Sequence, residues 1–199
     1  MAGDSPRDLV FITSNTNKVV EVKGILKEYG IESKHMDLEY PEIQADSIHE
    51  VALTSARHLC ERVNRPFFIE DAGLFIEALE GFPGPYSSYV HKTIGNSGIL
   101  KLMERVQQRA SKFESVVAYA DSIREIVVFR GVAEGNISLE ARGEGWGFDP
   151  IFIPKGANKT YAEMGIDAKQ RLSHRRTALE RFAVWINQRK RNGGLKFSL

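Results

Sequence analysis

The sequence has 199 residues, with 27 lysines and arginines against 26 aspartates and glutamates, so its formal net charge is +1. With 42% apolar and 27% charged residues, it has the composition of a folded globular protein of about one domain. These values exclude disordered, collagen-like and membrane-embedded proteins, and they argue against a chain-wide basic surface for nucleic acid. We therefore expect a single domain over residues 1–199.

The first elements are predicted to alternate between strands and helices. Residues 9–13 form a short apolar run typical of a strand buried on both faces, and apolar residues then recur at helical spacing up to Gly30. A second helix is predicted over 48–63. A second buried strand is predicted over 67–69, ending on Glu70 and Asp71, and a third helix over 93–109.

The rest of the chain favours antiparallel strands and a final helix. Residues 112–142 are rich in β-branched and aromatic side chains, and turn signals at 121–122 and 135–136 predict hairpins. Residues 143–161 form a loop rich in glycine, proline and aromatics, before a last helix over about 173–191. The fold class is therefore α/β, with parallel crossovers first and an antiparallel meander later.

The cysteine content and the lack of long apolar segments suggest a location. The single cysteine, Cys60, cannot form a disulfide within the chain, which suits a reducing compartment. The first seven residues do not resemble a signal peptide, and no stretch has the roughly 18 apolar residues that a spanning helix needs. We expect a cytoplasmic protein that binds no membrane.

A polar segment after the first strand is the first candidate site. Residues 13–18 read Thr-Ser-Asn-Thr-Asn-Lys and lead into a predicted helix, so that Lys18 stands in its first turn, where free N–H groups favour anions. The segment is not a Walker loop, because it lacks the glycine-bearing run that ends in Gly-Lys-Ser/Thr. Phosphate binding and ordinary helix capping are both open at this point.

Three acidic residues are candidate ligands of a cation. Glu70 and Asp71 follow an apolar strand, and Glu42 stands in the polar segment 40–44. Carboxylate oxygens are the hard ligands that Mg²⁺ accepts together with substrate phosphates. Capping of the following turn and helix is the alternative role for Glu70 and Asp71.

Two later segments combine aromatic or basic side chains with glycine or serine. In 145–150, Gly-Trp-Gly-Phe-Asp-Pro, two aromatics and a carboxylate suit stacking on a flat ring and reading its edge, with core aromatics in a tight turn as the alternative. In 169–176, four cations and His174 surround Ser173. Contacts to phosphate or base edges compete there with a solvated helix start, and His174 has no partner at zinc-ligand spacing.

Taken in chain order, four motifs resemble the inosine triphosphate pyrophosphatase family, also called dITP/XTP or non-canonical purine NTP pyrophosphatases. The resemblance runs from residue 9 to about residue 183. The motifs are Thr13-x-Asn15-x-x-Lys18-x-x-Glu21, Glu70-Asp71-x-Gly-Leu with the later Gly-x-Pro-Gly-x-Tyr-Ser87, Gly145-x-Gly-x-Asp-Pro-Ile-Phe152, and Lys169-x-x-x-Ser-His-Arg175.

The resemblance implies hydrolysis of ITP, dITP and XTP between the α- and β-phosphates, which yields the monophosphate and pyrophosphate and removes these nucleotides from the pool. It implies Mg²⁺ as cofactor, with Mn²⁺ as a candidate substitute, and a homodimer. It also implies an elongated, two-lobed fold around a central mixed sheet, with the active site in the cleft between the lobes. Two alternatives remain: a related pyrophosphatase for modified pyrimidine or canonical nucleotides, and a nucleic-acid-binding module built on the basic stretch 169–191.

The resemblance also assigns roles to individual residues. The triphosphate would be bound by Thr13, Ser14, Asn15, Thr16, Asn17 and Lys18, with Lys18 as the principal cation. Mg²⁺ would be held by Glu42 and Asp71, with Glu70 sharing the metal role and Asp71 also acting as base for the attacking water. The remaining substrate contacts would come from Ala72, Trp146, Gly147, Phe148, Asp149, Lys169, His174 and Arg175.

Two of these positions depart from the family pattern, and two others bear on selectivity. Ser14 stands where glycine is common and Ala72 where a hydroxyl residue is common, so we expect modest effects on affinity. Hypoxanthine and xanthine carry a carbonyl oxygen at position 6, where adenine carries an amino group. Donors from His174 and Arg175 at that edge would favour the oxygen, and such sites discriminate by about 10⁴ or more.

Overall fold

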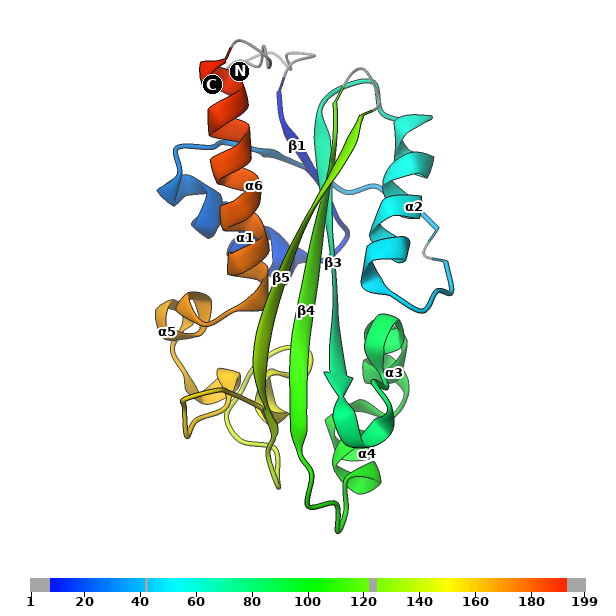
Figure 1. The fold of residues 1–199 in the computed structure, drawn as a ribbon, viewed down its shortest axis with the longest axis vertical. Helices are drawn as coiled ribbons and strands as arrows, with labels where there is room; N and C mark the ends of the chain where they lie inside the picture. The colour runs from blue at the N-terminus through cyan, green and yellow to red at the C-terminus, as the bar shows by residue number, and fades with distance from the viewer. Residues whose placement is uncertain (1–7, 42, 122–124, 193–199) are drawn as a thin grey trace.

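The computed structural model describes residues 8–41, 43–121 and 125–192, so Glu42 and the predicted turn residue Ser122 lie outside the described residues. The protein is built on one mixed sheet of six strands in the order β2-β1-β3-β4-β5-β6, with helices on both faces (Figure 1). The molecule is elongated along the long strands β3, β4 and β5 (Figure 1). The predicted α/β class is confirmed.

The helices and strands have the following bounds. The strands are β1 Val10–Ile12, β2 Lys34–Met36, β3 Phe67–Ile76, β4 Ala110–Ala120, β5 Ile126–Ile137 and β6 Phe152–Pro154. The α-helices are α1 Thr16–Glu28, α2 Ile48–Cys60, α3 Ser87–Thr93, α4 Gly95–Leu102, α5 Ile166–Arg171 and α6 His174–Arg191. Single 3-10 turns lie at Glu77–Leu79, Gly84–Tyr86, Asp149–Ile151 and Tyr161–Glu163.

The pairing of the strands creates an opening beside β3. β1 is parallel to both β2 and β3, whereas β3, β4, β5 and β6 pair in antiparallel fashion. The pairing of β1 with β3 stops at Phe68, but β3 continues to Ile76. The carboxyl end of β1 therefore lies beside the middle of β3, which is the kind of place where α/β sheets bind ligands.

Three apolar clusters hold the layers together. α1 and α6 pack on one face of the sheet around Phe11 and Phe182, and α2 packs on the opposite face around Ile12 and Leu59 (Figure 1). A third cluster, around Phe113, joins β3 and β4 to α3, α4 and the segment that follows β5. Burial of these side chains is the main stabilising contribution to the fold, at roughly 25 cal/mol per Å² of apolar surface.

Several sequence-based elements are confirmed, and three are wrong in detail. β1, α1, α2, the β4–β5 hairpin and α6 all lie where the sequence predicts them. β3 does not end on Glu70 and Asp71, because β4 pairs with it through Ile76. The helix predicted over 93–109 is the shorter α4, which begins at Gly95 with φ +62°, ends at Leu102, and follows α3 directly. Gly135 lies inside β5 rather than in a turn, where its missing side chain admits the Phe152 ring.

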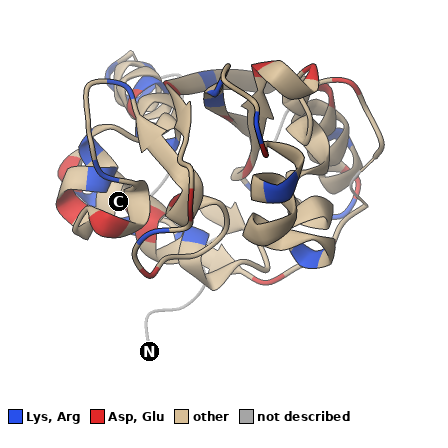
Figure 2. Ribbon diagram, turned by 90° about the horizontal axis from the view of Figure 1, so that it is seen from below, with Lys and Arg blue, Asp and Glu red and all other residues tan. Residues whose placement is uncertain are grey.

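The charged residues are distributed without a single dominant field. In Figure 2 the segments with Lys and Arg alternate with those carrying Asp and Glu around the molecule. Within the parts of the chain that the structure describes, no helix has both the length and the apolar character to cross a membrane.

Candidate active site

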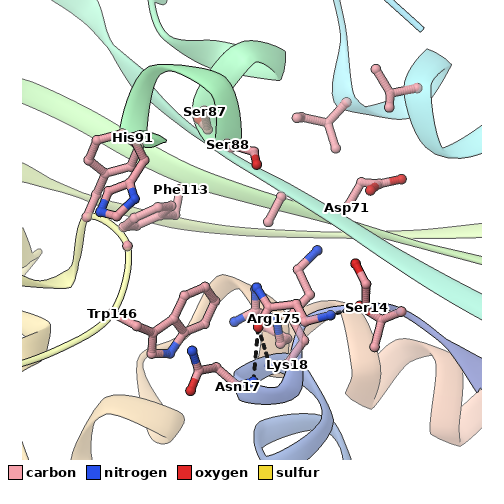
Figure 3. Close-up of a pocket in the computed structure, with 18 of the residues that line it drawn as sticks. Ser14, Asn17, Lys18, Asp71, Ser87, Ser88, His91, Phe113, Trp146 and Arg175 are labelled. Atoms are coloured by element: carbon pink, nitrogen blue, oxygen red, sulfur yellow. Dashed lines mark hydrogen bonds between the residues drawn. The ribbon is translucent and has the colours of Figure 1, made fainter. Parts of the chain in front are cut away.

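A cavity of about 870 Å³ opens at the carboxyl end of β1. This volume falls in the range of sites for small molecules and cofactors. Its walls come from the loop between β1 and α1, the middle of β3, α3, the segment 146–149 and the start of α6. Figure 3 shows side chains of α3 on one side of the cavity, with Asn17, Lys18 and Arg175 across from them.

The segment 13–18 caps α1 and lines the cavity at the same time. The side chain of Asn15 accepts hydrogen bonds from the backbone nitrogens of Asn17 at 3.0 Å and Lys18 at 3.2 Å. Thr13 Oγ1 accepts from the backbone nitrogen of Asn15 at 3.1 Å. The predicted capping is thus confirmed, and the beginning of a 13-residue helix faces the cavity with its positive dipole end.

Lys18 is anchored to β3 at the floor of the cavity. Its Nζ donates a hydrogen bond to the carbonyl oxygen of Glu70 at 2.6 Å and lies 3.0 Å from Oε2 of the same residue. The side chain of Lys18 keeps 17% of its surface exposed. Its charge is therefore held at a fixed point of the wall while remaining accessible to an anion.

The adjacent acids of β3 have different surroundings. Asp71 lines the cavity, and Figure 3 shows its carboxylate projecting into it. Glu70 is 1% exposed, does not line the cavity, and accepts a hydrogen bond from Ser115 Oγ at 2.5 Å. Neighbouring residues of a strand point to opposite faces, which explains why only one of the two acids reaches the cavity.

The donor set around Asp71 fits a cation that is held partly by its substrate. Among residues 8–41, 43–121 and 125–192, no group of three or more His, Cys, Asp or Glu side chains is arranged as a metal cage. Mg²⁺ in phosphate-handling sites is held by one or two carboxylates together with phosphate oxygens and water. Asp71 offers one such carboxylate, and the predicted ligand Glu42 lies outside the described residues.

At the other end of the cavity, charged side chains meet around Glu21. Oε1 of Glu21 accepts hydrogen bonds from Trp146 Nε1 at 3.1 Å and Lys169 Nζ at 2.7 Å. Oε2 accepts from an Nη of Arg175 at 2.5 Å. Lys169 also donates to Asp149 Oδ2 at 2.6 Å. The Arg175 guanidinium lies 5.3 Å from the Trp146 ring centroid, which places a flat cation next to a flat aromatic wall.

Two buried acids of the site, Glu21 and Glu70, are held in the ionised form by neighbouring cations. Burial alone would raise the pKa of Glu21, but Arg175 and Lys169 outweigh it and lower that pKa to about 2. The same competition, with Arg175 and Lys18 as the cations, lowers the pKa of Glu70. Burial raises the pKa of Asp149 against the opposing influence of Lys169. The two ionised acids keep the facing cations in fixed positions.

His174 contributes a neutral ring to the cavity wall. It is 4% exposed and stacks on Phe113 with ring centroids 4.6 Å apart. Burial, reinforced by the charge of Arg175, lowers the pKa of His174 to about 3. Its Nδ1 is buried and has no hydrogen-bond partner among the residues that the structure describes.

The α3 wall was not predicted from the sequence. α3 begins at Ser87, six residues before the predicted helix, and brings Ser87, Ser88, His91 and Lys92 to the cavity. Ser87 Oγ accepts from the backbone nitrogen of Leu74 at 2.8 Å and donates to the carbonyl oxygen of Gly84 at 2.7 Å, which ties α3 to β3. The turn-rich segment before Ser87 was the available signal for this earlier start.

Most predicted site residues come together in this one cavity. Two of them, Glu70 and Lys169, do not line the cavity but contact residues that do. Glu70 pairs with Lys18 and Arg175, and Lys169 donates a hydrogen bond to Asp149. Glu21 appears in the first motif without a predicted role, yet it accepts hydrogen bonds from the side chains of Trp146, Lys169 and Arg175. The predicted residues that line the cavity are Thr13, Ser14, Asn15, Thr16, Asn17, Lys18, Asp71, Ala72, Trp146, Gly147, Phe148, Asp149, His174 and Arg175.

Comparison with known proteins agrees with the motif-based resemblance. The model of the Ham1 family matches residues 9–185. The dITP/XTP pyrophosphatase of Methanopyrus kandleri is 52% identical over 178 residues, which cover 89% of this chain and 95% of the relative. The dITP/XTP pyrophosphatase of Thermococcus kodakarensis is 50% identical over 181 residues, with coverage of 90% and 97%.

A solved structure supports the same fold. The HAM1 protein from Coxiella burnetii superposes with a TM-score of 0.79 at 28% sequence identity. The match covers 92% of this chain and 99% of that protein. The similarity therefore extends over nearly the whole fold.

Proposed function

The chain belongs to the Ham1 family, and from this premise we propose that it hydrolyses dITP, XTP and ITP to the nucleoside monophosphate and pyrophosphate. The observation that carries the proposal is a single cavity with a helix N-terminus, Lys18 and Asp71 at one end and Trp146 with Arg175 at the other. The first end suits a triphosphate, and the second suits a purine base. Relatives named dITP/XTP pyrophosphatase match about nine-tenths of the chain.

At the phosphate end, the protein supplies position and charge. The N-terminal end of α1, with its positive dipole end, and the ammonium of Lys18 line the space in which the triphosphate would lie. Phosphoryl transfer depends on placing the reactants and neutralising negative charge, so this cradle needs no covalent nucleophile. Lys18 is held by Glu70, which keeps its charge in place before substrate arrives.

Asp71 is the proposed base and metal-binding residue of the reaction. Its carboxylate faces the cavity and would accept the proton of the water that attacks the α-phosphate (Figure 3). We propose that Asp71 and Glu42 hold Mg²⁺, with Mn²⁺ as substitute. When bound, such an ion neutralises phosphate charge. That Glu70 shares the metal stays a prediction from the sequence; its Oε1 accepts a hydrogen bond from Ser115 and its Oε2 lies 3.0 Å from Nζ of Lys18.

The base end is proposed to select against the 6-amino group of adenine; guanine shares the 6-oxygen of hypoxanthine, so this contact does not distinguish GTP from ITP. The Trp146 ring offers a stacking surface, while Arg175 and the neutral ring of His174 line the same part of the cavity. A guanidinium carries only donors, so it pairs with the 6-oxygen of hypoxanthine or xanthine and faces the amino group of adenine without a partner. Selection against ATP thus follows from an unpaired donor rather than from size.

We also propose a homodimer in a reducing cytoplasm. Tyr86, Tyr89 and Ile94, in and beside α3, expose 41%, 69% and 42% of their surface and provide an apolar area for a second copy. The single cysteine, Cys60, suits a reducing compartment. Light scattering of the wild-type protein and of a Tyr89→Glu variant tests the dimer, which the variant should dissociate.

The decisive experiment is pyrophosphate release from ITP, XTP, dITP, ATP and GTP at saturating Mg²⁺. We expect strong turnover of the first three, with pyrophosphate rather than orthophosphate as product, and its loss in Asp71→Asn. Asp167→Asn, which changes an exposed acid of α5, serves as the matched control with wild-type activity. Turnover that is equal on all five nucleotides, or that survives in Asp71→Asn, would contradict the proposal.

A further inference from the structure

The carboxylate of Glu70 is shut off from the cavity although its neighbour Asp71 lines it. The side chain of Glu70 has no exposed surface. It faces the layer formed by α1 and α6, and its carboxylate lies between a cation of each helix. A buried charge without partners is costly, so the identity of its partners indicates what the residue does.

The partners are two cations that belong to opposite ends of the cavity. Nζ of Lys18, at the phosphate end, lies 3.0 Å from Oε2 of Glu70. Nε of Arg175, at the base end, lies 3.2 Å from Oε1. Ser115 Oγ donates to that same Oε1 at 2.5 Å and so fixes the rotation of the carboxylate. Each oxygen therefore lies within ion-pair distance of a cation, and Oε1 also accepts a hydrogen bond, whereas Oε2 accepts none among the described residues.

We propose that Glu70 is a positioning residue that holds Lys18 and Arg175 in a fixed relation to each other, rather than a ligand of Mg²⁺. This inference rests on the proposed function, in which Lys18 faces the phosphates and Arg175 the base. One buried carboxylate then connects the cation that binds the triphosphate to the cation that selects the base. Its loss should disturb base selection as well as turnover.

Binding of IMP without metal provides the first test. Glu70→Gln keeps the shape of the side chain and removes its charge, so in EDTA we expect calorimetry to show IMP binding at least about fivefold weaker than in wild type. Loss of a negative charge by itself would strengthen binding of the IMP phosphate. Weaker binding therefore reports a displaced Arg175, and unchanged or tighter binding would overturn the inference.

Asp71→Asn is the matched comparison for that measurement. It removes the same charge from the neighbouring residue of β3 but leaves both contacts of Glu70 with Lys18 and Arg175 in place. We expect it to bind IMP in EDTA at least as tightly as the wild type. A loss as large as that of Glu70→Gln would mean that net charge, rather than position, governs binding, and would overturn the inference.

Metal affinity separates a positioning role from a ligand role. Mn²⁺ binding is measured by electron paramagnetic resonance with imidodiphosphate present as a non-hydrolysable phosphate group. We expect Glu70→Gln to bind Mn²⁺ with an affinity within about twofold of wild type. Asp71→Asn should lose at least about tenfold in Mn²⁺ affinity, because of these two acids only Asp71 lines the cavity. A tenfold loss in Glu70→Gln would identify it as a metal ligand.

Ser115→Ala covers the case in which Glu70→Gln does not fold. It removes only the hydroxyl donor to Glu70, leaves every charge in place, and should weaken IMP binding and the ITP-over-ATP preference by roughly two- to fivefold. Wild-type values for both quantities in Ser115→Ala would count against the inference. Failure of the proposed function is distinct, because the wild-type protein itself would then release no pyrophosphate from ITP.

Discussion

Nζ of Lys169 lies 2.6 Å from Oδ2 of Asp149, and the two side chains keep only 11% and 10% of their surface exposed. The same Nζ lies 2.7 Å from Oε1 of Glu21. One buried ammonium therefore forms ion pairs with two buried acids, and it connects α5 with both α1 and the segment 146–149. Sequence reasoning places Lys169 among the substrate contacts, whereas its observed contacts are to these acids.

We predict that Lys169→Met destabilises the protein by about 3–5 kcal/mol, because it leaves Asp149 buried without its cation and removes one of the two cations of Glu21. The free energy of unfolding is measured by urea titration, and the KM for ITP should rise as Asp149 moves. Lys155→Met is the matched control, since its partner Glu134 lies at a similar distance of 2.7 Å but both side chains are largely exposed. Equal unfolding midpoints for the two variants would contradict this account.

A second prediction concerns base selection by Arg175. Arg175→Ala removes the guanidinium beside Trp146, so the preference for ITP over ATP should fall by at least about tenfold, while the Mg²⁺ concentration for half-maximal activity changes little. Ratios of kcat/KM for the two nucleotides provide the measurement. Arg176→Ala, which removes pairs with Glu28 and Glu180 outside the cavity, is the control. Equal losses on ITP and ATP would argue against selection by Arg175.

Parts of the site that depend on local signals were predictable from the sequence. Asn15 and Ser173 cap α1 and α6 through their side chains, and each cap brings a cavity residue, Lys18 or His174, into place just after it. Such capping requires only a polar residue followed by helical spacing. The sequence therefore predicts the starts of α1 and α6 correctly.

Other parts depend on contacts between distant segments and could not be predicted in the same way. The alternation of a strand predicts that Glu70 and Asp71 point to opposite sides, but the sequence does not tell which of them faces the cavity, and the tertiary structure places Asp71 there. The role of Glu21 depends on Trp146 and Lys169, which are more than 120 residues away in the chain. No local pattern carries this information, because such contacts form only through the tertiary fold.

A third prediction uses the pKa of His174, which burial lowers to about 3 from an ordinary value of 6.5. The unfolded chain takes up a proton at this residue below pH 6.5, whereas the folded protein does not until about pH 3. Its contribution to stability is therefore complete above pH 6.5 and is lost as the pH falls. His174→Gln should reduce the loss of unfolding free energy between pH 6.5 and 5, measured by urea titration.

His49→Gln, at an exposed position of α2, is the control for the histidine prediction. The range above pH 5 avoids the titration of Glu21, whose pKa of about 2 makes its own contribution disappear only between about pH 4.5 and 2. The pH profile of kcat should likewise show no limb from His174 between pH 5 and 8, because the ring stays neutral there. If the unfolding free energy of His174→Gln fell between pH 6.5 and 5 as steeply as that of wild type, the lowered pKa of His174 would be refuted.

A fourth prediction concerns Gly131 of β5, which lies directly beneath the start of α6. A Cβ at this position would overlap the carbonyl oxygen of His174 and lie 2.5 Å from the backbone nitrogen of Ala178. Gly131→Ala must therefore push α6 away from the sheet, so we expect a lower melting temperature and a weaker ITP-over-ATP preference as Arg175 shifts. Gly165→Ala, where an added Cβ meets no atom within 4 Å, is the control. If both variants had the melting temperature and the ITP-over-ATP preference of wild type, close packing of α6 on β5 would not determine the position of Arg175.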